Sequence, residues 1–322
     1  MNFQSIHYFL GLAGEKNFTR AAEKLHITQQ TLSASLASLE KELGVKLMVR
    51  QPRLELTYAG KAFYRYALEW EKGQEDCRRT LADISGNRTG ELRIGAASTR
   101  SRLLLPPVIE KFGKEYPGVD FLLRGDSNRG LIKGLREREL DLAIAHFQDC
   151  PAGIRLIPLY EEEIHFLIRK DLLAGLTGLP EEEAEALLRS CPEHFIDRLE
   201  GCPFLSNSLN NVAGAVENHY LSAAPFTPRI RAVSNHMTTL LSFCCRGLGG
   251  LFAPDFIIER CLSEDDLSRL FRLPLPETRY TISAGCPAGD APWKIRDDFI
   301  ECLLEEVRRP AGKEDRTERR IP

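Results

Sequence analysis

Small polar side chains gather on one predicted helix in a pattern that suits the recognition of nucleic-acid bases. They occupy the N-terminal end of a helix over residues 28–43 and the side opposite its leucines: Thr28, Gln29, Gln30, Ser33 and Ala34. Amides and hydroxyls can hydrogen-bond to base edges, and short side chains allow close approach to a major groove. A helix that only covers its own core usually exposes Lys and Glu there, so a solvated Ser/Ala-rich helix is the alternative.

A second set of polar residues could bind a small anion. Ser98, Thr99, Arg100 and Ser101 stand between a predicted strand and the start of a predicted helix. Free N–H groups at a helix start, together with hydroxyls, favour a carboxylate or a similar anion. The competing interpretation is a plain helix cap without a ligand.

The sequence offers little support for catalysis or for a bound metal. Its nine cysteines contain no C-x-x-C pair, and its seven histidines form no H-E-x-x-H motif. The glycine-rich run 247–250 follows a predicted helix and precedes a strand, which is the reverse of the dinucleotide-binding order. We therefore expect no enzyme activity, no catalytic residues, no metal and no cofactor.

Two short predicted helices position the base-reading side chains. Thr19 is a suitable N-cap for a helix over residues 20–25, and Thr28 is one for the following helix. Leucines recur every three or four residues along that second helix: Leu32, Leu36, Leu39 and Leu43. Two helices joined by so short a turn are typical of a helix-turn-helix.

The residues after this pair predict a β-hairpin wing with a basic tip. The stretch 45–57 alternates like two short strands around Gln51 and Pro52, with Arg50 and Arg53 at the bend. Beside a recognition helix, such a tip would meet phosphates or the minor groove. A surface hairpin without that role is the alternative.

A long helix is predicted over residues 59–85, with Thr57 as its cap. Its apolar positions 63, 70, 77 and 84 are seven apart and form one seam along the helix. Because nothing nearby in the sequence covers this seam, we expect the same helix of a second copy to do so in a dimer. Packing against the body of the chain is the alternative.

A polar linker at 85–90 separates this head from a body in which strand and helix patterns alternate. The alternation predicts an α/β architecture with a mostly parallel sheet. The stretch 170–202 is interpreted as a surface helical insertion, and the charged tail at 311–322 as disordered.

Length and charge fit this organisation. The 322 residues exceed the size at which a single hydrophobic core usually stops growing. Residues 1–90 hold 13 Lys and Arg against 10 Asp and Glu, whereas the rest holds 30 against 36, so a mildly basic head precedes an acidic body. No apolar run reaches the ~18 residues of a membrane span and no basic segment opens a signal peptide, so a cytoplasmic protein is expected.

Residues 3 to 64 contain a series of short motifs at fixed positions: FTRAA at 18–22, Leu25, TQ at 28–29, Ser33, LE at 39–40, LG at 43–44, Leu47, Arg50, LT at 56–57 and AG at 59–60. With these motifs in register, the segment resembles the N-terminal domain of LysR-type transcriptional regulators without a gap. The body is similar to that family in layout, with LPP at 105–107, DLAI at 141–144 and GLG at 247–249.

This resemblance implies a fold class and its domains. It implies an N-terminal all-α winged helix-turn-helix (1–58), a linker and dimerisation helix with a hinge (59–88), and a two-lobed α/β periplasmic-binding-protein-like effector domain (89–310). Lobe I would comprise residues 89–162 and 269–310, and lobe II residues 163–268. The lobes would be joined by crossovers near 159–163 and 267–273, with the ligand between them.

The resemblance also implies particular site residues. The family's DNA contacts fall on positions in the helix and the wing: Thr28, Gln29, Ser33, Arg50 and Arg53. Gln30 stands where the family usually has proline and Ala34 where arginine is frequent, so the operator sequence does not follow. Opposite the residues at 98–101 we place further ligand contacts from strand ends alone: Ser127, Asn128, Leu205, Ser206 and Asn235.

The function implied is that of a sequence-specific DNA-binding transcriptional regulator of LysR type, controlled by a small-molecule inducer for which an anion is favoured. Its partners would be a double-stranded DNA operator, the inducer, further copies in a dimer or tetramer, and RNA polymerase, with no membrane contact. A thiol-based redox-sensing regulator of the same family, using Cys191 and Cys202, is the main alternative. An exported solute-binding protein would not need the head, and a structural chromosome-associated protein would not need the body.

Overall fold

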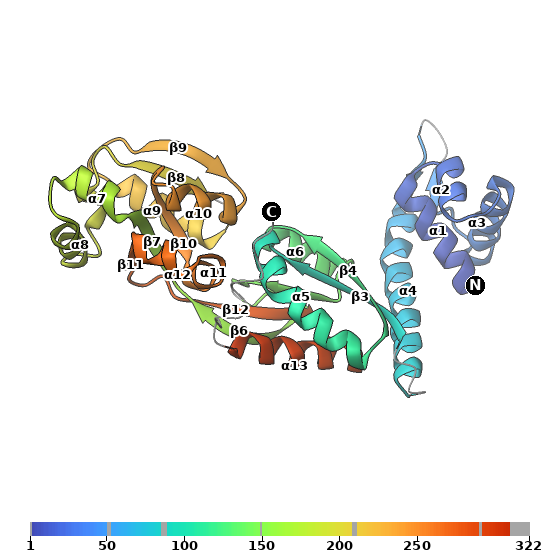
Figure 1. The fold of residues 1–322 in the computed structure, drawn as a ribbon. Helices are drawn as coiled ribbons and strands as arrows, with labels where there is room; N and C mark the ends of the chain where they lie inside the picture. Colours follow the sequence, from blue (N-terminus) through green and yellow to red (C-terminus); the bar gives the residue numbers. More distant parts are fainter. Residues whose placement is uncertain are drawn as a thin grey trace. The chain divides into compact units, whose positions relative to one another are not determined.

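The computed structural model describes residues 2–49, 53–84, 89–148, 150–207, 211–289 and 292–309. It divides into two compact units, one within residues 1–87 and the other beginning at residue 88 (Figure 1). Within the described residues, no helix combines the length and the apolar character that crossing a lipid bilayer requires.

The N-terminal unit is a winged helix-turn-helix followed by a long helix. Its elements in chain order are α1 (Phe3–Glu15), α2 (Phe18–Lys24), α3 (Gln29–Leu43), β1 (Met48–Val49), β2 (Glu55–Leu56) and α4 (Tyr58–Ile84). Helix α2 begins earlier than predicted, because the side chain of Asn17, rather than Thr19, accepts the capping hydrogen bond from the Arg20 N–H at 3.1 Å. The predicted helix-turn-helix is otherwise confirmed.

The leucines of α3 determine which way this helix faces. Leu32, Leu36 and Leu39 are buried in the core of the unit, which also contains Phe9. At the helix start, the Thr28 hydroxyl accepts a hydrogen bond from the N–H three residues on, at 3.1 Å. Because the apolar side of α3 is buried, its small polar side is left on the surface of the unit.

The buried carboxylate of Glu40 ties the wing to α3. It accepts hydrogen bonds from the Leu47 and Met48 N–H groups, at 2.9 and 3.2 Å, and pairs with Lys46 at 2.6 Å. Burial alone would raise the pKa of Glu40, but Lys46 and the two N–H groups outweigh burial and lower it. Strands β1 and β2 pair antiparallel, as predicted, and the tip at 50–52, with Arg50, lies outside the described residues.

Helix α4 packs its first turns on α1. Its cap is Thr57, as predicted, and the buried ring of Phe63 lies edge-on to Phe9 with 5.1 Å between the ring centroids. The expectation that nothing nearby covers the apolar seam was therefore wrong for these turns. Farther along the seam, Trp70 and Cys77 remain exposed.

The second unit consists of two lobes, each built on a five-stranded sheet (Figure 1). The first lobe comprises β3 (Thr89–Ala96), α5 (Ser98–Glu115), β4 (Gly118–Gly125), α6 (Asn128–Arg136), β5 (Leu142–Ala145), β6 (Ile154–Glu162), β12 (Tyr280–Pro287) and α13 (Lys294–Arg308). Its strand order is β4-β3-β5-β12-β6. The first three strands are parallel and β12 is antiparallel to both its neighbours, so the chain returning from the second lobe completes this sheet.

The second lobe is the middle part of the chain. It comprises β7 (Ile164–Arg169), α7 (Lys170–Thr177), α8 (Glu181–Arg189), a 3₁₀ turn (Phe195–Arg198), β8 (Pro203–Asn207), α9 (Val212–Ala223), β9 (Arg229–Ser234), α10 (Met237–Cys245), β10 (Gly250–Pro254), α11 (Asp255–Cys261), α12 (Glu264–Arg269) and β11 (Leu270–Pro274). Its strand order is β11-β7-β10-β8-β9. The predicted two-lobed α/β architecture is confirmed, but the prediction of a mostly parallel sheet was wrong, because each sheet has two parallel and two antiparallel pairs of neighbouring strands.

Two crossovers join the lobes. The first lies at Glu163, between β6 and β7, within the predicted range. The second lies at 275–279, because β11 pairs with β7 and so belongs to the second lobe. The prediction of this crossover at 267–273, with lobe I resuming at 269, was wrong because a core strand runs there, with three buried side chains: Leu270, Phe271 and Leu273.

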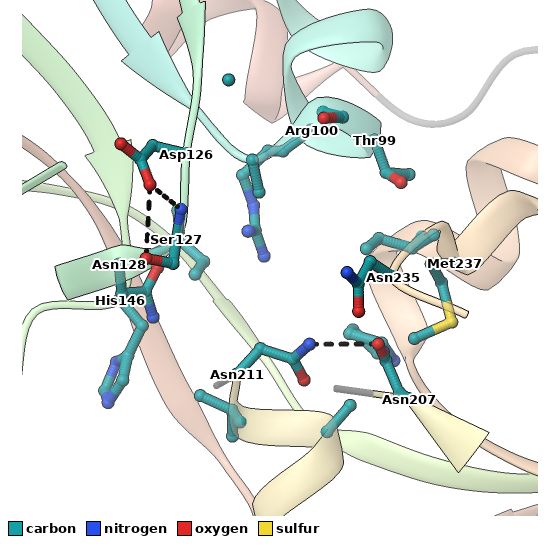
Figure 2. Close-up of a pocket in the computed structure, with 18 of the residues that line it drawn as sticks. Thr99, Arg100, Asp126, Ser127, Asn128, His146, Asn207, Asn211, Asn235 and Met237 are labelled. Atoms are coloured by element: carbon teal, nitrogen blue, oxygen red, sulfur yellow. Dashed lines mark hydrogen bonds between the residues drawn. The ribbon is translucent and has the colours of Figure 1, made fainter. Parts of the chain in front are cut away.

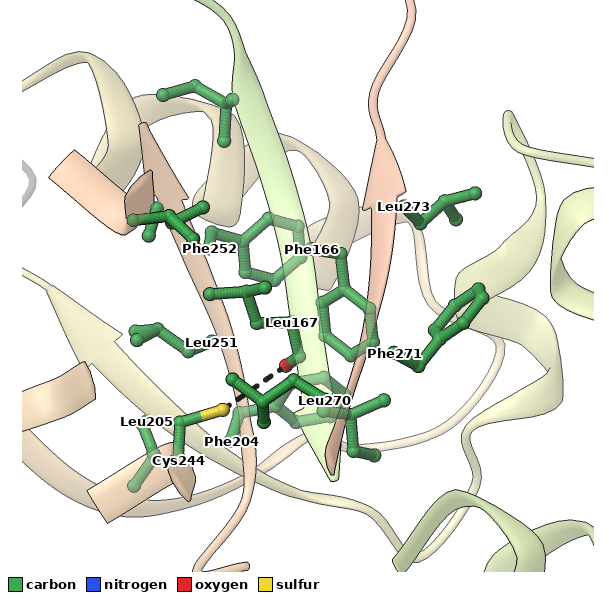
Figure 3. Close-up of a cluster of buried hydrophobic side chains, with 14 of the residues drawn as sticks. Phe166, Leu167, Phe204, Leu205, Cys244, Leu251, Phe252, Leu270, Phe271 and Leu273 are labelled. Atoms are coloured by element: carbon green, nitrogen blue, oxygen red, sulfur yellow. Dashed lines mark hydrogen bonds between the residues drawn. The ribbon is translucent and has the colours of Figure 1, made fainter. Parts of the chain in front are cut away.

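Aromatic side chains fill the core of the second lobe (Figure 3). Phe166 of β7 and Phe252 of β10 lie 5.3 Å apart between ring centroids, and Phe204 of β8 packs in the same cluster. Leu173 of α7 and Leu188 of α8 are buried in it too. The stretch 170–202 is helical, as predicted, but it is part of the core layer rather than a surface insertion.

Candidate functional site

The predicted base-reading side chains lie on the surface of α3 and at its start. Four of them are exposed: Thr28, Gln29, Gln30 and Ala34. The fifth, Ser33, is half-buried. Arg53, on the described side of the wing, is also exposed, whereas Arg50 lies outside the described residues. A helix with an exposed face of small and amide side chains, next to a hairpin, has the dimensions needed to enter a major groove.

A cavity of about 300 Å³ lies between the two lobes of the second unit (Figure 2). It is at the small end of the range for sites that hold organic ligands. Six of the nine predicted ligand contacts line it: Ser98, Thr99, Arg100, Ser127, Asn128 and Asn235. Both lobes contribute, so a molecule bound here would touch both.

Three predicted contacts do not line this cavity. Ser101 lies within α5, because that helix begins at Ser98 and not beyond the polar cluster. Leu205 is fully buried in the core of the second lobe, and the Ser206 hydroxyl donates to the Asn207 carbonyl at 3.3 Å. Successive side chains of a strand point to opposite faces, so position at a strand end does not by itself aim a side chain at a ligand.

The sequence interpretation missed amides that the second lobe contributes. Asn211 caps α9 by accepting from the Gly214 N–H at 2.9 Å, and its own amide donates to Asn207 Oδ1 at 3.2 Å (Figure 2). The buried carboxylate of Glu217 accepts from the Asn207 N–H at 2.9 Å, and burial raises the pKa of Glu217. An asparagine just before a helix that follows a strand was the signal available for Asn211.

Among the described residues, five helices begin at this cavity: α5, α6, α9, α10 and α11. Ser127 and Asn211 cap α6 and α9 with their side chains. The residues before α5 and α10, Ala97 and His236, make no side-chain cap bond. At least one helix in each lobe therefore presents first-turn N–H groups without a side-chain cap, and the partial positive charge of a helix start attracts anions.

Arg100, in the first turn of α5, is the cation of the cavity wall, and it is paired. Its Nε donates to the Tyr160 hydroxyl at 2.8 Å and its Nη2 forms an ion pair with Glu162. The Tyr280 hydroxyl donates to the same carboxylate. Burial would lower the pKa of Arg100, but Glu162 and the two tyrosines outweigh it and raise the pKa, so the guanidinium is charged.

The acidic residue of the wall is also neutralised. Asp126 pairs with Arg124 at 3.1 Å and accepts a hydrogen bond from the Ser127 N–H at 2.7 Å. Figure 2 shows its carboxylate turned toward Ser127. The polar groups that the wall presents to a ligand are mainly hydroxyls, amides and helix starts, which favours anionic groups over cations, and apolar side chains such as Val212, Met237 and Ile257 line the rest of the wall.

One cluster in the described part of the chain groups three potential metal ligands: Glu163, His165 and Asp255. The imidazole of His165 has no nitrogen left for a metal, because Nδ1 accepts from Arg272 Nε at 2.6 Å and Nε2 donates to Glu163 at 2.9 Å. Burial and Arg272 lower the pKa of His165. These residues form an ion-pair cluster at the first crossover, and their geometry does not suit a metal centre.

The two cysteines of the redox alternative have different surroundings. Cys202 is buried, its thiol donates to the Pro203 carbonyl at 3.3 Å, and burial raises its pKa to about 12. Cys191 is exposed. Since the thiolate is the reactive form, a thiol with so high a pKa reacts slowly at neutral pH.

Known proteins resemble both units. Residues 3–61 match the family described as bacterial regulatory helix-turn-helix protein, lysR family, and residues 85–308 match the LysR substrate binding domain. The chain is 33% identical over 313 residues to the transcriptional dual regulator GltC of Bacillus subtilis (strain 168), across 95% of this chain and 97% of the relative. A full-length OxyR variant from Pseudomonas aeruginosa shares the fold, with a TM-score of 0.62 at 23% identity over 96% of this chain and 95% of that one.

Other relatives match over less of their length. The probable RuBisCO transcriptional regulator of Phaeodactylum tricornutum (strain CCAP 1055/1) is 32% identical over 171 residues, so the chain spans 56% of that relative and the match covers 52% of this chain.

A winged helix-turn-helix joined to a two-lobed α/β domain is an architecture of bacterial transcriptional regulators. Within that class, the chain belongs to the LysR family.

Proposed function

We propose that this protein is a sequence-specific DNA-binding transcriptional regulator, controlled by a small molecule that binds between the lobes of its second unit. One observation carries the proposal: a single chain combines the exposed polar face of α3 with an inter-lobe cavity lined by hydroxyls, amides and a guanidinium. In this proposal the protein has no catalytic role, needs no cofactor and acts in the cytoplasm.

The DNA-binding domain would span residues 1–58. Gln29, Gln30 and Ser33 would contact base edges, since amides and hydroxyls make such contacts, and Thr28 and Ala34 would allow close approach. Arg50 and Arg53 would contact phosphates beside the groove. Among these residues, Ser33 is half-buried and Arg50 lies outside the described residues. The exposure of the others supports this assignment.

The effector domain would span residues 89–310 and bind an anionic inducer. The helix starts in both lobes and the buried Arg100 support an anion. A ligand that touches both lobes would favour one inter-lobe angle over others, which is how binding energy shifts a conformational equilibrium.

Self-association would occur first through α4. Four side chains of this helix, spaced by four, seven and four residues, lie on one side of it and are exposed: Tyr66, Trp70, Cys77 and Leu81. The same helix of a second copy would cover them. The edge strands β4 and β9 also expose apolar side chains, at Leu122 and at Val233, and further copies could cover these in a tetramer.

The ligand would act on transcription through the geometry of this assembly. A changed inter-lobe angle would change the spacing of the DNA-binding domains, hence the bend of the operator and the access of RNA polymerase. Footprints with and without the inducer that showed the same contacts and the same bend would contradict this mechanism.

The DNA contacts can be tested on the upstream region of the protein's own gene. Replacing Gln29 or Ser33 by Ala should weaken operator binding by about 1 to 3 kcal/mol for each lost base contact, while binding to random DNA changes little. Gln4→Ala is a matched control, because Gln4 is an exposed glutamine near the start of α1. Unchanged discrimination between operator and random DNA in both α3 variants would contradict the assignment.

The redox alternative has its own test. If peroxide changes DNA binding by the wild-type protein, the Cys191→Ser and Cys202→Ser variants show whether either thiol is responsible. A response that persists unchanged in both variants removes this alternative. Loss of the response in one of them would favour a thiol sensor over a ligand-controlled regulator.

A further inference from the structure

The guanidinium of Arg100 is nearly enclosed, yet part of it faces the inter-lobe cavity. Only 7% of the residue is exposed, and it lines the cavity wall. Its Nε and Nη2 are engaged by Tyr160 and Glu162. Its Nη1 makes no hydrogen bond to the described residues. This nitrogen is not fully enclosed by the protein either. Nη1 is therefore the part of Arg100 that a ligand can reach.

Glu162 pairs with the other side of this guanidinium, but the burial of its carboxylate is energetically unfavourable. Its side chain is fully buried, and one oxygen, Oε1, receives both Arg100 and the Tyr280 hydroxyl. The second oxygen, Oε2, has no hydrogen-bond partner among the described residues. A buried carboxylate with one unsatisfied oxygen has lost hydration that its partners only partly replace. Accordingly, burial raises the pKa of Glu162 despite the adjacent Arg100.

A ligand carboxylate at the same place would find more partners than Glu162 has. It could pair with the free Nη1 of Arg100 and accept hydrogen bonds from first-turn N–H groups of α5, which has no side-chain cap. The hydroxyls of Ser98 and Thr99 line the same wall. Its negative charge would, however, lie close to that of Glu162, and two carboxylates that share one cation repel each other.

We propose that Glu162 sets the affinity of the cavity for anions: it is the internal counter-ion of Arg100, and a ligand carboxylate binds by competing with it for the guanidinium. This inference rests on the proposed function, since it concerns the same cavity. Glu162 does not itself line the cavity. It keeps the binding of anions weak, so that the affinity for a ligand depends on the ligand's other contacts.

The proposal can be tested with the smallest carboxylate and its uncharged counterpart. Acetate and acetamide have nearly the same shape and differ in charge, so they probe the Arg100 subsite whatever the true ligand is. Their dissociation constants from the full-length protein can be measured from the line widths of their methyl NMR signals, in a carboxylate-free buffer of low chloride content.

Glu162→Gln keeps an acceptor for Arg100 and Tyr280 but removes the charge. We expect this variant to bind acetate about tenfold more tightly than the wild type, since a competing like charge has been removed. Binding of acetamide should change less than twofold. In the double variant Arg100→Gln, Glu162→Gln, which leaves no unpaired buried charge, acetate should lose its advantage over acetamide.

Glu161→Gln is the matched control, because Glu161 is the exposed neighbour of Glu162 on the same strand and carries the same charge. It should leave both affinities unchanged. The proposal is overturned if Glu162→Gln fails to bind acetate more tightly than the wild type, if acetamide gains as much as acetate, or if Glu161→Gln reproduces the gain. Melting temperatures of all variants identify any that fail to fold.

Binding of the same samples to the upstream DNA separates this inference from the proposed function. If the wild-type protein binds its upstream DNA but Glu162→Gln shows no gain in acetate affinity, only this inference is contradicted. If the protein does not bind the DNA but shows the predicted gain, the regulatory role is contradicted and the anion subsite is supported.

Discussion

Two glycines of α4 show how much a single methyl group can matter at the residue scale. A Cβ on Gly60 would lie 2.0 Å from the Leu47 carbonyl oxygen, so the helix can approach the wing only without a side chain here. A Cβ on Gly73, in the same helix, would have nothing within 4 Å of it. The two residues therefore serve as a matched pair.

We predict that Gly60→Ala lowers the free energy of unfolding by about 1 to 3 kcal/mol, because the backbone of the wing must move away. Gly73→Ala should be neutral or stabilise by up to about 1 kcal/mol, since alanine favours an exposed helix. Thermal unfolding of both variants beside the wild type measures this. Equal effects at the two positions would contradict the packing of α4 on the wing.

A basic side chain of the wing permits a second prediction at this scale. Arg53 is exposed and is assigned to a phosphate rather than to a base. Arg53→Ala should weaken binding to operator and random DNA by the same factor, and should reduce the slope of log affinity against log salt by about one unit. Titrations at several salt concentrations measure both effects. Selective loss of operator binding would show instead that Arg53 reads bases.

At the scale of elements, Glu40 connects the recognition helix to the wing. Its carboxylate is buried and receives two backbone N–H groups from the start of β1 and the residue before it. The orientation of the hairpin relative to α3 therefore depends on one ionised side chain. Because its pKa is lowered in the folded state, its contribution to stability is present above the ordinary glutamate pKa and is lost as the pH falls through the lowered value.

We therefore predict that Glu40→Gln lowers stability at neutral pH by about 1 to 3 kcal/mol. The difference from the wild type should shrink as the pH falls below about 4.3, the ordinary glutamate pKa. Melting temperatures measured from about pH 3 to about pH 7 would show this. Glu23→Gln, at an exposed position of α2, should show no such difference at any pH.

At the scale of the whole molecule, the chain combines two units whose surfaces are incomplete in a single copy. The exposed stripe on α4 is the clearest sign, since Leu81 is 59% exposed and Trp70 is 39% exposed. Apolar side chains in one row along a helix are normally covered by a partner.

We predict that Leu81→Glu weakens or abolishes the dimer, because it places a charge in the proposed contact between two α4 helices. Leu68→Glu is the matched control: Leu68 is an exposed leucine of the same helix, but it lies on the opposite side from the stripe. Sedimentation velocity distinguishes the two. A dimer that survives Leu81→Glu and dissociates with Leu68→Glu would place the contact on the other face of α4.

Local patterns in the sequence were enough to predict the head and the general plan of the body. The leucine spacing of α3 and the cap at Thr57 depend only on residues close together in the chain, so they could be recognised without tertiary information. The strand and helix alternation likewise predicted an α/β body, and the family resemblance implied its two lobes. The capping signal failed at Asn17, because asparagine and threonine are both suitable caps and the sequence does not choose between Asn17 and Thr19. The second crossover, which was taken from the family resemblance, was misplaced because β11 pairs with β7 in the second lobe.

The composition of the inter-lobe cavity was decided only by the tertiary structure. Asn211 and Tyr280 are far apart in sequence, and nothing in either segment shows that both line the same space. The pairing of Arg100 with Glu162 is of the same kind, because it depends on how α5 packs against the end of β6. Periodicity and capping are properties of short segments, whereas a binding site is made by side chains that only the packing of distant segments brings together.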